Sequence, residues 1–252
     1  MEDYKGYVLP PLIRGRLIKR YKRFLADVEL DDGSVVTAHC PNSGSMRGCA
    51  EPGAPVWISE SDNPKRKLKY TWEIIRTEAS WIGINTQVPN RLVKASVENG
   101  LVEELAGYTR VTAEVKTSDH TRLDLMLEDE AGGRCYVEIK NCTLVEAGVA
   151  MFPDAVTTRG QKHLEELVRL KEAGHEAVIF YLIQRTDATV FSPAAAIDPV
   201  YADKLVWAAG KGVRIITRDV EILAGNDPGI IRLRAPVPVR LDTGSLFASK
   251  TG

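Results

Sequence analysis

The stretch TRLDLMLEDEAGGRCYVEIKNCT, residues 121–143, decides the fold of the second half of the chain. Apolar and polar side chains alternate on both sides of a glycine-containing loop at 129–133. Because side chains on a strand point alternately to its two faces, this pattern predicts two strands that each cover a core. A short loop with glycine joins antiparallel neighbours, so the stretch predicts a β-hairpin.

The register of this hairpin brings charged residues together. Simple antiparallel pairing across the loop sets Leu127 opposite Cys135, and the same register then sets Asp124 opposite Glu138. Lys140 follows on the same face, two residues further along. The reverse face of the first strand is expected to be apolar: Leu123, Leu125 and Leu127. Two opposed carboxylates repel each other, and a cation between them would relieve that cost.

The chemistry of this patch points to a metal. Oxygen ligands from Asp124 and Glu138 suit the hard cations Mg²⁺ or Mn²⁺. Such a cation lowers the pKa of a bound water and shields the charge of a phosphate, and Lys140 could orient that water or stabilise a negative transition state. The alternative is a surface hairpin on which Glu138 and Lys140 are merely exposed.

The whole-chain composition sets limits. The 252 residues suffice for one large domain or two small ones, and the net charge of −1 excludes a uniformly basic nucleic-acid binder. Four cysteines without CxxC spacing predict unpaired thiols and fit a reducing cytoplasm. The sequence contains no apolar run of about 18 residues, so no membrane span is expected. The N-terminus lacks the pattern of a secretory signal. We therefore expect a cytoplasmic protein.

Positive charge is concentrated locally. One cluster contains no acid and comprises Arg14, Arg16, Lys19, Arg20, Lys22 and Arg23. A second comprises Lys65, Arg66, Lys67 and Lys69. Clustered cations are typical of a surface that binds the phosphate backbone of DNA. A solvated strand and a charged loop tip would give the same pattern, so both interpretations stay open.

The first part of the chain, residues 1–83, predicts a small all-β domain. Turn signals separate strands expected at 12–18, 23–30, 35–40, 55–59 and 69–78. Five short strands fit an OB-like barrel that could bind nucleic acid. Four aromatic residues could stack on bases or fill the core, and we expect at least half to be core residues: Trp57, Tyr70, Trp72 and Trp81.

The second part, residues 84–235, predicts a mixed sheet flanked by helices. Asn90 is expected to cap a helix over 91–106 that Gly107 ends. Beyond it we expect strands at 110–116, 121–128, 135–143, 177–183 and 213–217, and helices at 158–173 and 199–209. This order of helices and strands places the domain in the mixed α/β class. Residues 236–252 show little pattern and are expected to form a C-terminal tail.

The hairpin and its neighbours resemble a known family. Asp124 followed by Val137-Glu138-Ile139-Lys140 looks like the catalytic hairpin of the PD-(D/E)xK, restriction-endonuclease-like superfamily. Longer stretches resemble the sugar fermentation stimulation protein A family over roughly residues 10–220: PNSGSM (41–46), YVEIKNCTL (136–144) and FPDAVTTRGQKHLEEL (152–167). The resemblance implies an OB-like domain joined to a nuclease-like domain, with non-specific DNA binding.

The resemblance also implies roles for individual residues. In the superfamily, residues matching Asp124 and Glu138, with the carbonyl matching that of Ile139, hold the metal. The lysine matching Lys140 assists the water. A polar group on the next helix often completes the site, and Gln161 matches that position.

Further residues beside the hairpin stay open at this point. The superfamily's upstream acid matches Glu98 or Glu114, and the family pattern favours Glu114. Arg122 and Arg159 could bind phosphate bidentately or form a salt bridge to Asp124 or Asp154. His163 could act as a base, although a structural hydrogen bond is the role we favour.

The favoured function is metal-dependent hydrolysis of phosphodiester bonds in single- or double-stranded DNA. The alternative is a non-catalytic, non-specific DNA-binding regulator, linked by the family name to sugar metabolism, that retains the nuclease fold. RNA binding through the barrel is a third hypothesis. The combination of Asp124, Glu138 and Lys140 favours the enzyme, because a pure binder has no need for opposed carboxylates. Nucleases of this type often need a partner site to cut both strands, which suggests a homodimer.

Overall fold

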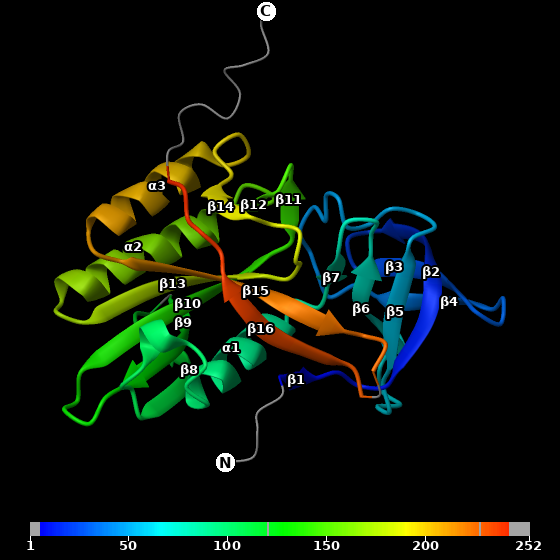
Figure 1. The fold of residues 1–252 in the computed structure, drawn as a ribbon, viewed down its shortest axis with the longest axis horizontal. Coiled ribbons are helices and arrows are strands. Elements are labelled where there is room, and N and C mark those ends of the chain that lie inside the picture. The colour runs from blue at the N-terminus through cyan, green and yellow to red at the C-terminus, as the bar shows by residue number, and fades with distance from the viewer. Residues whose placement is uncertain (1–5, 120, 227, 242–252) are drawn as a thin grey trace, which may run out of the picture.

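The computed structural model describes residues 6–119, 121–226 and 228–241. A barrel formed by the N-terminal part lies beside a sheet with helices formed by the C-terminal part (Figure 1). Residues 242–252 of the expected C-terminal tail lie outside the described residues, as do residues 1–5 of the first domain. No helix in the described ranges is long and apolar enough to span a membrane.

The N-terminal part forms the expected closed barrel. Its strands are β2 (Leu12–Tyr21), β3 (Leu25–Leu30), β4 (Val35–His39), β5 (Pro55–Glu60), β6 (Tyr70–Arg76) and β7 (Trp81–Gly83). They are hydrogen-bonded in the order β4-β3-β2-β5-β6-β7, and a parallel pairing of β4 with β6 closes the barrel. The five predicted strands are confirmed, and β7 is a short addition that pairs with β6.

The aromatic residues of the barrel serve mainly as core. Trp72 is completely buried inside the barrel. Trp57 and Trp81 contact each other with ring centroids 4.4 Å apart, and both pack against the apolar core of the C-terminal part. This contact joins the two parts of the molecule through buried apolar area, which favours their fixed association.

The C-terminal part is a mixed sheet, as predicted. Its strand order is β1-β16-β15-β13-β10-β9-β8. The strands are β1 (Tyr7–Val8), β8 (Arg110–Lys116), β9 (Arg122–Glu128), β10 (Arg134–Cys142), β13 (Glu176–Ile183), β15 (Arg214–Leu223) and β16 (Ile230–Pro236). The central strand β13 runs parallel to β10 and β15, whereas β9 runs antiparallel to both of its neighbours, β8 and β10. β13 is buried on both faces, which explains why its sequence is a continuous apolar run.

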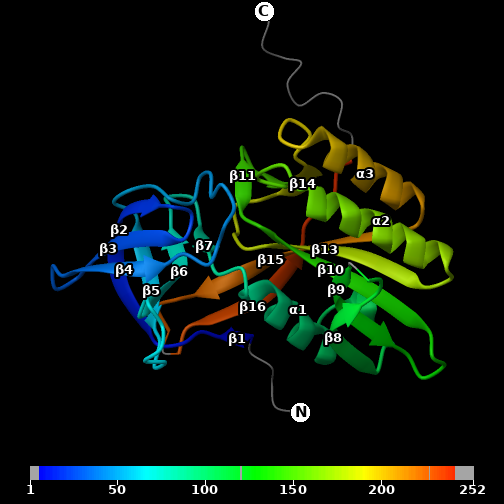
Figure 2. The ribbon, with the colours of Figure 1, turned by 180° about the vertical axis from the view of Figure 1, so that it is seen from behind.

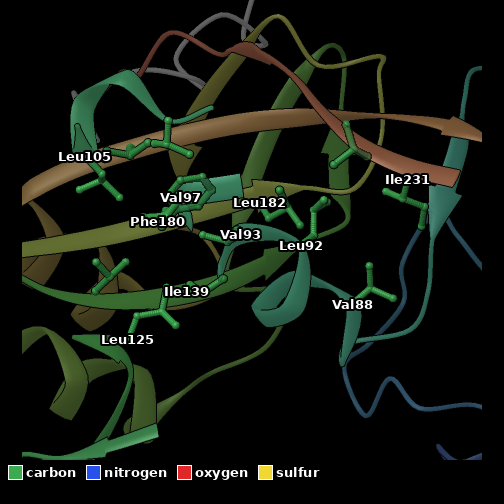
Figure 3. Packing of buried hydrophobic residues seen from close by; sticks show 14 of the residues in the cluster. Val88, Leu92, Val93, Val97, Leu105, Leu125, Ile139, Phe180, Leu182 and Ile231 are labelled. Atoms are coloured by element: carbon green, nitrogen blue, oxygen red, sulfur yellow. The ribbon is translucent and has the colours of Figure 1, made fainter. Parts of the chain in front are cut away.

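Helices cover both faces of this sheet (Figure 2). Helix α1 (Val88–Glu98) covers one face, where Leu92 and Val93 pack with Ile139, Phe180 and Leu182 (Figure 3). Helices α2 (Thr158–Glu172) and α3 (Pro199–Gly210) cover the other face. The two apolar clusters therefore fix β10 between α1 and α2.

Helix α1 differs from its prediction at both ends. It begins at Val88 after the cap residue Gln87, so Asn90 lies inside the helix and the prediction that it caps the helix was wrong. Pro89 explains the earlier start, because proline fits the first helical turn. The helix ends at Glu98 rather than near 106, since Gly100 takes a φ of +70° that breaks the helix. A short 3₁₀ helix, η1 (Glu103–Leu105), follows.

The sequence patterns missed the shorter strands. β11 (Leu144–Glu146), β12 (Val149–Phe152) and β14 (Val190–Pro193) form a separate small sheet. β15 continues to Leu223 instead of ending near 217, and it then pairs with β16. β1 pairs with β16, so residues 7 and 8 lie in the sheet of the C-terminal part although they precede the barrel. The domain boundaries drawn from the sequence stay a prediction.

Candidate functional site

The predicted hairpin register is confirmed up to the site. Leu127 lies opposite Cys135, and the last regular pair of β9 with β10 is Leu125 with Val137. Beyond that pair the Asp124 side chain replaces the ladder, because its Oδ2 accepts a hydrogen bond of 2.7 Å from the backbone N–H of Ile139. The regular pairing of β9 with β10 therefore ends at Leu125, the residue next to Asp124.

The alternation of β9 breaks at the same point. Leu125 and Leu127 pack in the core under α1, but Leu123 packs in the core under α2. The prediction that the three leucines share one face was therefore wrong for Leu123. On the neighbouring strand β8, Glu114 has a φ of +53° and is skipped in the pairing, which resumes in the same register with Val115 opposite Leu123.

Glu138 is a buried carboxylate with one oxygen satisfied and one not. The side chain is almost fully buried, and its Oε1 accepts hydrogen bonds from Lys140 Nζ at 2.6 Å and from His163 Nδ1. Lys140 Nζ also lies 3.3 Å from His163 Nδ1. The other oxygen, Oε2, is buried without a hydrogen-bond partner among the described residues. An unpartnered buried oxygen is costly unless a ligand completes it.

The two carboxylates differ in how readily they ionise. Burial and the nearby charge of Glu138 raise the pKa of Asp124 to about 6, although hydrogen bonds from Ile139 and Asn90 oppose this shift. Burial also disfavours ionisation of Glu138, but the charge of Lys140 and the His163 hydrogen bond outweigh it and lower the pKa of Glu138. Glu138 is therefore ionised at neutral pH. Asp124 is also mostly ionised there, but it takes up a proton when the pH falls to about 6.

The donor set fits a divalent cation. Asp124 and Glu138 supply carboxylate oxygens, and Ile139, which follows Glu138 in β10, donates its backbone N–H to Asp124. The unpartnered Oε2 of Glu138 is the kind of hard oxygen that Mg²⁺ or Mn²⁺ prefers. Across the described ranges no group of three or more His, Cys, Asp or Glu side chains could hold a metal, so such a site would rely on two carboxylates and a backbone carbonyl.

Three predicted site residues lie apart from this pair. Gln161 donates its side-chain amide to Asp198 at 3.0 and 3.1 Å, and Asp198 caps α3. Glu114 is largely exposed and pairs with Arg122 at 3.0 Å. Glu98 pairs with Lys94 on the exposed side of α1. Their catalytic roles stay predictions, because a bound substrate would have to bring them to the hairpin.

His163 makes the structural hydrogen bond that the sequence analysis favoured, and its partner is Glu138 of the hairpin. The histidine lies on the first turns of α2, is 5% exposed, and joins Glu138 and Lys140 to Arg159, whose Nε lies 3.4 Å from His163 Nε2. A cavity of about 420 Å³ beside it is lined by Thr121, Arg122, Thr158, Arg159, Lys162 and His163. The cavity brings the two predicted phosphate ligands, Arg122 and Arg159, to one wall. The spacing of His163 from Arg159 by one helical turn was the available signal.

The first basic cluster is mostly engaged in the barrel itself. Arg20 donates to the carbonyl oxygens of Asn42 and Gly44, both at 2.9 Å, and so holds the loop that precedes β5. Arg16 donates to the Gly53 carbonyl, and Lys19 pairs with Asp27. Two of its members, Lys22 and Arg23, form a turn with positive φ. Contact of this cluster with DNA, including Arg14, stays a prediction.

The loop held by Arg20 also contacts the C-terminal part. Ser45 Oγ and Met46 N donate to Asp154 Oδ2 at 3.1 and 3.3 Å. Gly44 lies so close to Asp154 that a Cβ there would be 2.4 Å from its oxygen. The PNSGSM segment singled out in the sequence therefore fastens the barrel to the chain just before α2.

The four cysteines are free and buried, as predicted. Burial raises the pKa of the Cys49 and Cys142 thiols to about 12 and that of Cys135 to about 11. A thiol that stays protonated is a poor nucleophile and metal ligand. These residues therefore serve the core and not the site.

Comparison with known proteins agrees with this architecture. The family description "SfsA N-terminal OB domain" matches residues 18–84, and "Sugar fermentation stimulation protein RE domain" matches residues 87–226. A sugar fermentation stimulation protein homolog from Geobacter sulfurreducens is 54% identical over 92% of this chain and 98% of that relative. Another from Geotalea uraniireducens is 56% identical over 82% of this chain and 89% of that relative.

A solved structure has the same fold. The structure of Pyrococcus furiosus SfsA in complex with Ca²⁺ has a TM-score of 0.83 with 25% identity, covering 94% of this chain and 99% of that chain. Barrel, sheet and helices therefore recur together in the relative. The chain belongs to the sugar fermentation stimulation protein family.

Proposed function

We propose that the protein is a metal-dependent nuclease that hydrolyses phosphodiester bonds in DNA at the β9–β10 hairpin. The observation that carries this proposal is the buried Oε2 of Glu138, which lacks a partner in the described structure beside a second carboxylate, Asp124. A buried carboxylate beside a second, partly buried one costs stability unless a cation or a function compensates. The Pyrococcus furiosus relative was solved in complex with Ca²⁺, which supports divalent-cation binding by a protein of this fold.

Each residue of the site has a role in this proposal. Asp124, Glu138 and the carbonyl of Ile139 would hold Mg²⁺ or Mn²⁺, which when bound supplies an activated water and charge neutralisation. Lys140 Nζ, already 2.6 Å from Glu138, orients the attacking water or stabilises charge on the phosphate. Asn90 and the Ile139 N–H hold the Asp124 carboxylate in one orientation.

His163 positions the lysine. Its ring lies against both Glu138 and Lys140, and it is held from the other side by Arg159. A buried ring in this place keeps the ammonium of Lys140 from swinging toward solvent. We assign His163 as a positioning residue, since nothing in the geometry requires it to touch the substrate.

The substrate is bound through its backbone. Arg122, Arg159 and Lys162 line the cavity beside the hairpin, and guanidinium groups bind phosphate oxygens in pairs. Backbone contacts carry no base sequence, so these residues would bind single- or double-stranded DNA without sequence preference of their own. Each chain has one such hairpin, and cutting of both strands of a duplex would be favoured by a homodimer.

A specific observation also favours the second candidate, a DNA-binding regulator without catalysis. Lys140 and His163 both pair with Oε1 of Glu138, so the chain's own residues already offset part of the charge of this carboxylate. A protein that only binds DNA would need no more than this. The two candidates differ in one respect, which is metal-dependent cleavage.

The test is an incubation of purified protein with end-labelled single- and double-stranded DNA in Mg²⁺, Mn²⁺ or Ca²⁺. Cleavage is expected in Mg²⁺ or Mn²⁺ and is expected to be lost in both Asp124→Asn and Lys140→Ala. Lys171→Ala serves as the matched control, because Lys171 lies at the far end of α2 and pairs with Glu176. Tight DNA binding without cleavage in any of these metals would exclude the nuclease and leave the non-catalytic DNA-binding regulator as the remaining candidate.

A further inference from the structure

A second polar cavity lies between the barrel and the N-terminal end of α1. Its volume is about 610 Å³, within the range of about 300–1,000 Å³ typical of ligand pockets. Arg91 of α1 lines it, and the residue before Arg91 is Asn90, whose Nδ2 donates to Asp124 at 2.7 Å. The cavity wall and the hairpin site are therefore linked through consecutive residues of one helix.

Two arginines line this cavity without a carboxylate partner. Arg66 Nη2 donates to Thr71 Oγ1 at 3.0 Å, and Arg91 Nη1 lies 3.4 Å from the Tyr7 hydroxyl. Neither makes an ion pair within the part of the chain that the structure describes. Both charges act on the nearby carboxylate of Glu73, but neither guanidinium is held by a direct ion pair. Such groups at a cavity wall are suited to phosphate, which a guanidinium binds with two parallel hydrogen bonds.

A buried carboxylate lies on the same wall. Glu73 of β6 is 4% exposed, its Oε1 accepts from Ser59 Oγ at 2.7 Å, and its Oε2 accepts from Asn85 Nδ2 at 2.8 Å. Burial raises the pKa of Glu73, while these hydrogen bonds and the charges of Arg66 and Arg91 oppose that shift. A carboxylate has about four acceptor positions, so roughly two remain for a ligand.

We propose that this cavity binds one nucleotide of a nucleic-acid strand that passes the hairpin site, with its phosphate on Arg66 and Arg91 and its base edge on Glu73. The proposal rests on the proposed function in taking nucleic acid as the partner, but it requires no cleavage. A carboxylate accepts a hydrogen bond from the amino group of cytosine and repels the carbonyl oxygen that uracil carries at the same position. The strand is therefore read for a base with an amino group at this one place.

The test compares short oligo-dC with oligo-dU, whose bases differ only in this group and the adjoining ring nitrogen. Binding is measured by fluorescence polarisation in EDTA, at mildly alkaline pH where both stay single-stranded. The native protein is expected to bind oligo-dC about tenfold more tightly, the size of a good base contact. Glu73→Gln is expected to remove most of that preference, because an amide both donates and accepts.

The arginine contact has its own readout. Arg91→Ala is expected to weaken both oligomers equally and to lower the slope of log K against log salt by about 0.7, the value for one phosphate of a single strand. Arg110→Ala on β8, which pairs with Glu128, and Glu29→Gln on the barrel surface are the matched controls and should change neither quantity. Free dCMP should compete poorly, since it lacks the rest of the strand.

Three results would overturn the proposal: equal affinity for oligo-dC and oligo-dU, a preference that survives Glu73→Gln, or full competition by dCMP at equal nucleotide concentration. Because the assay contains no divalent metal, its outcome is independent of catalysis. A cytosine preference in a protein that never cleaves DNA would remove only the nuclease proposal. Cleavage without this preference would remove only the present one.

Discussion

Glu138 in the hairpin and Glu73 in the cavity between the barrel and α1 are both buried carboxylates, but their partners differ in charge. Glu73 receives hydrogen bonds from neutral groups on both oxygens, and its pKa is raised by burial. Glu138 receives a charged ammonium and an imidazole on one oxygen, nothing described on the other, and its pKa is lowered. Burial alone thus does not decide the state of a carboxylate, and the hairpin site is arranged to keep its anion.

The largest expected effect is the loss of folding stability when Lys140 is replaced by alanine. Lys140→Ala leaves the Glu138 carboxylate buried with the His163 contact alone, so the free energy of unfolding should fall by about 3 kcal/mol. Urea unfolding measures this change. Lys204→Ala, which breaks a more exposed pair with Glu165, should cost less than about 1 kcal/mol. Equal costs for the two variants would mean that Glu138 does not depend on the charge of Lys140.

Mn²⁺ affinity should depend on pH through Asp124 in the hairpin site and not through Glu73 in the other cavity. The Asp124 pKa is raised from 3.8 to about 6, so Asp124 takes up a proton as the pH falls through 6 and can no longer bind a cation. Below that pH, Mn²⁺ affinity should fall by up to about tenfold per pH unit, the limit for one competing proton. Calorimetric titrations at pH 8, 6 and 5 would measure it.

A control separates this proton from others. Asp124→Asn should bind Mn²⁺ weakly with little change between pH 8 and 5. Glu73→Gln should leave the metal affinity and its pH dependence unchanged, because Glu73 lies in the other cavity. A native affinity that does not change between pH 8 and 5 would exclude Asp124 as a ligand.

A smaller effect is expected from Glu73 on stability. Because the folded-state pKa of Glu73 lies above 4.5, its ionisation destabilises the fold as the pH rises through that range. Glu73→Gln should therefore gain stability at pH 7 relative to the native chain, by about 1 kcal/mol, and lose this advantage below pH 4.5. Thermal unfolding at pH 4 and pH 7 measures the difference. A loss of stability at pH 7 would show that the carboxylate is needed by its neighbours.

The smallest effect should come from the arginines of the same cavity. Arg91 is exposed and makes only a 3.4 Å contact with Tyr7, so Arg91→Ala should change the unfolding free energy by less than about 0.5 kcal/mol. Such a small change would indicate that Arg91 does not stabilise the fold and is available to bind a ligand. A cost above about 2 kcal/mol would assign Arg91 to structure instead.

The fold was largely predictable where side chains alternate over several residues. The barrel strands, the hairpin register at Leu127 and Cys135, and helix α2 follow from local patterns. The short strands β1, β11, β12 and β14 were not predictable, because two to four residues carry no readable period and long-range pairing creates them. The same holds for the PNSGSM loop, whose role depends on Asp154, far along the chain.

The site was predictable in part for similar reasons. Asp124, Glu138 and Lys140 lie on one hairpin, so strand geometry suffices to bring them together. His163 meets them only because α2 packs on β10, and the cavity around Glu73 exists only because the barrel lies beside α1. Contacts between elements decide these two features. The spacing within α2 places His163 beside Arg159 but does not show that it meets the hairpin.

The central claim is that a divalent cation binds between Asp124 and Glu138. Crystals soaked in Mn²⁺ and measured at a wavelength with strong manganese anomalous scattering test it directly. A cation bound there should give a single strong peak at coordination distance from an Asp124 oxygen, from Glu138 Oε2 and from the Ile139 carbonyl, with Lys140 still near Glu138. No peak there at saturating Mn²⁺, with Glu138 Oε2 still unpartnered, would contradict the account.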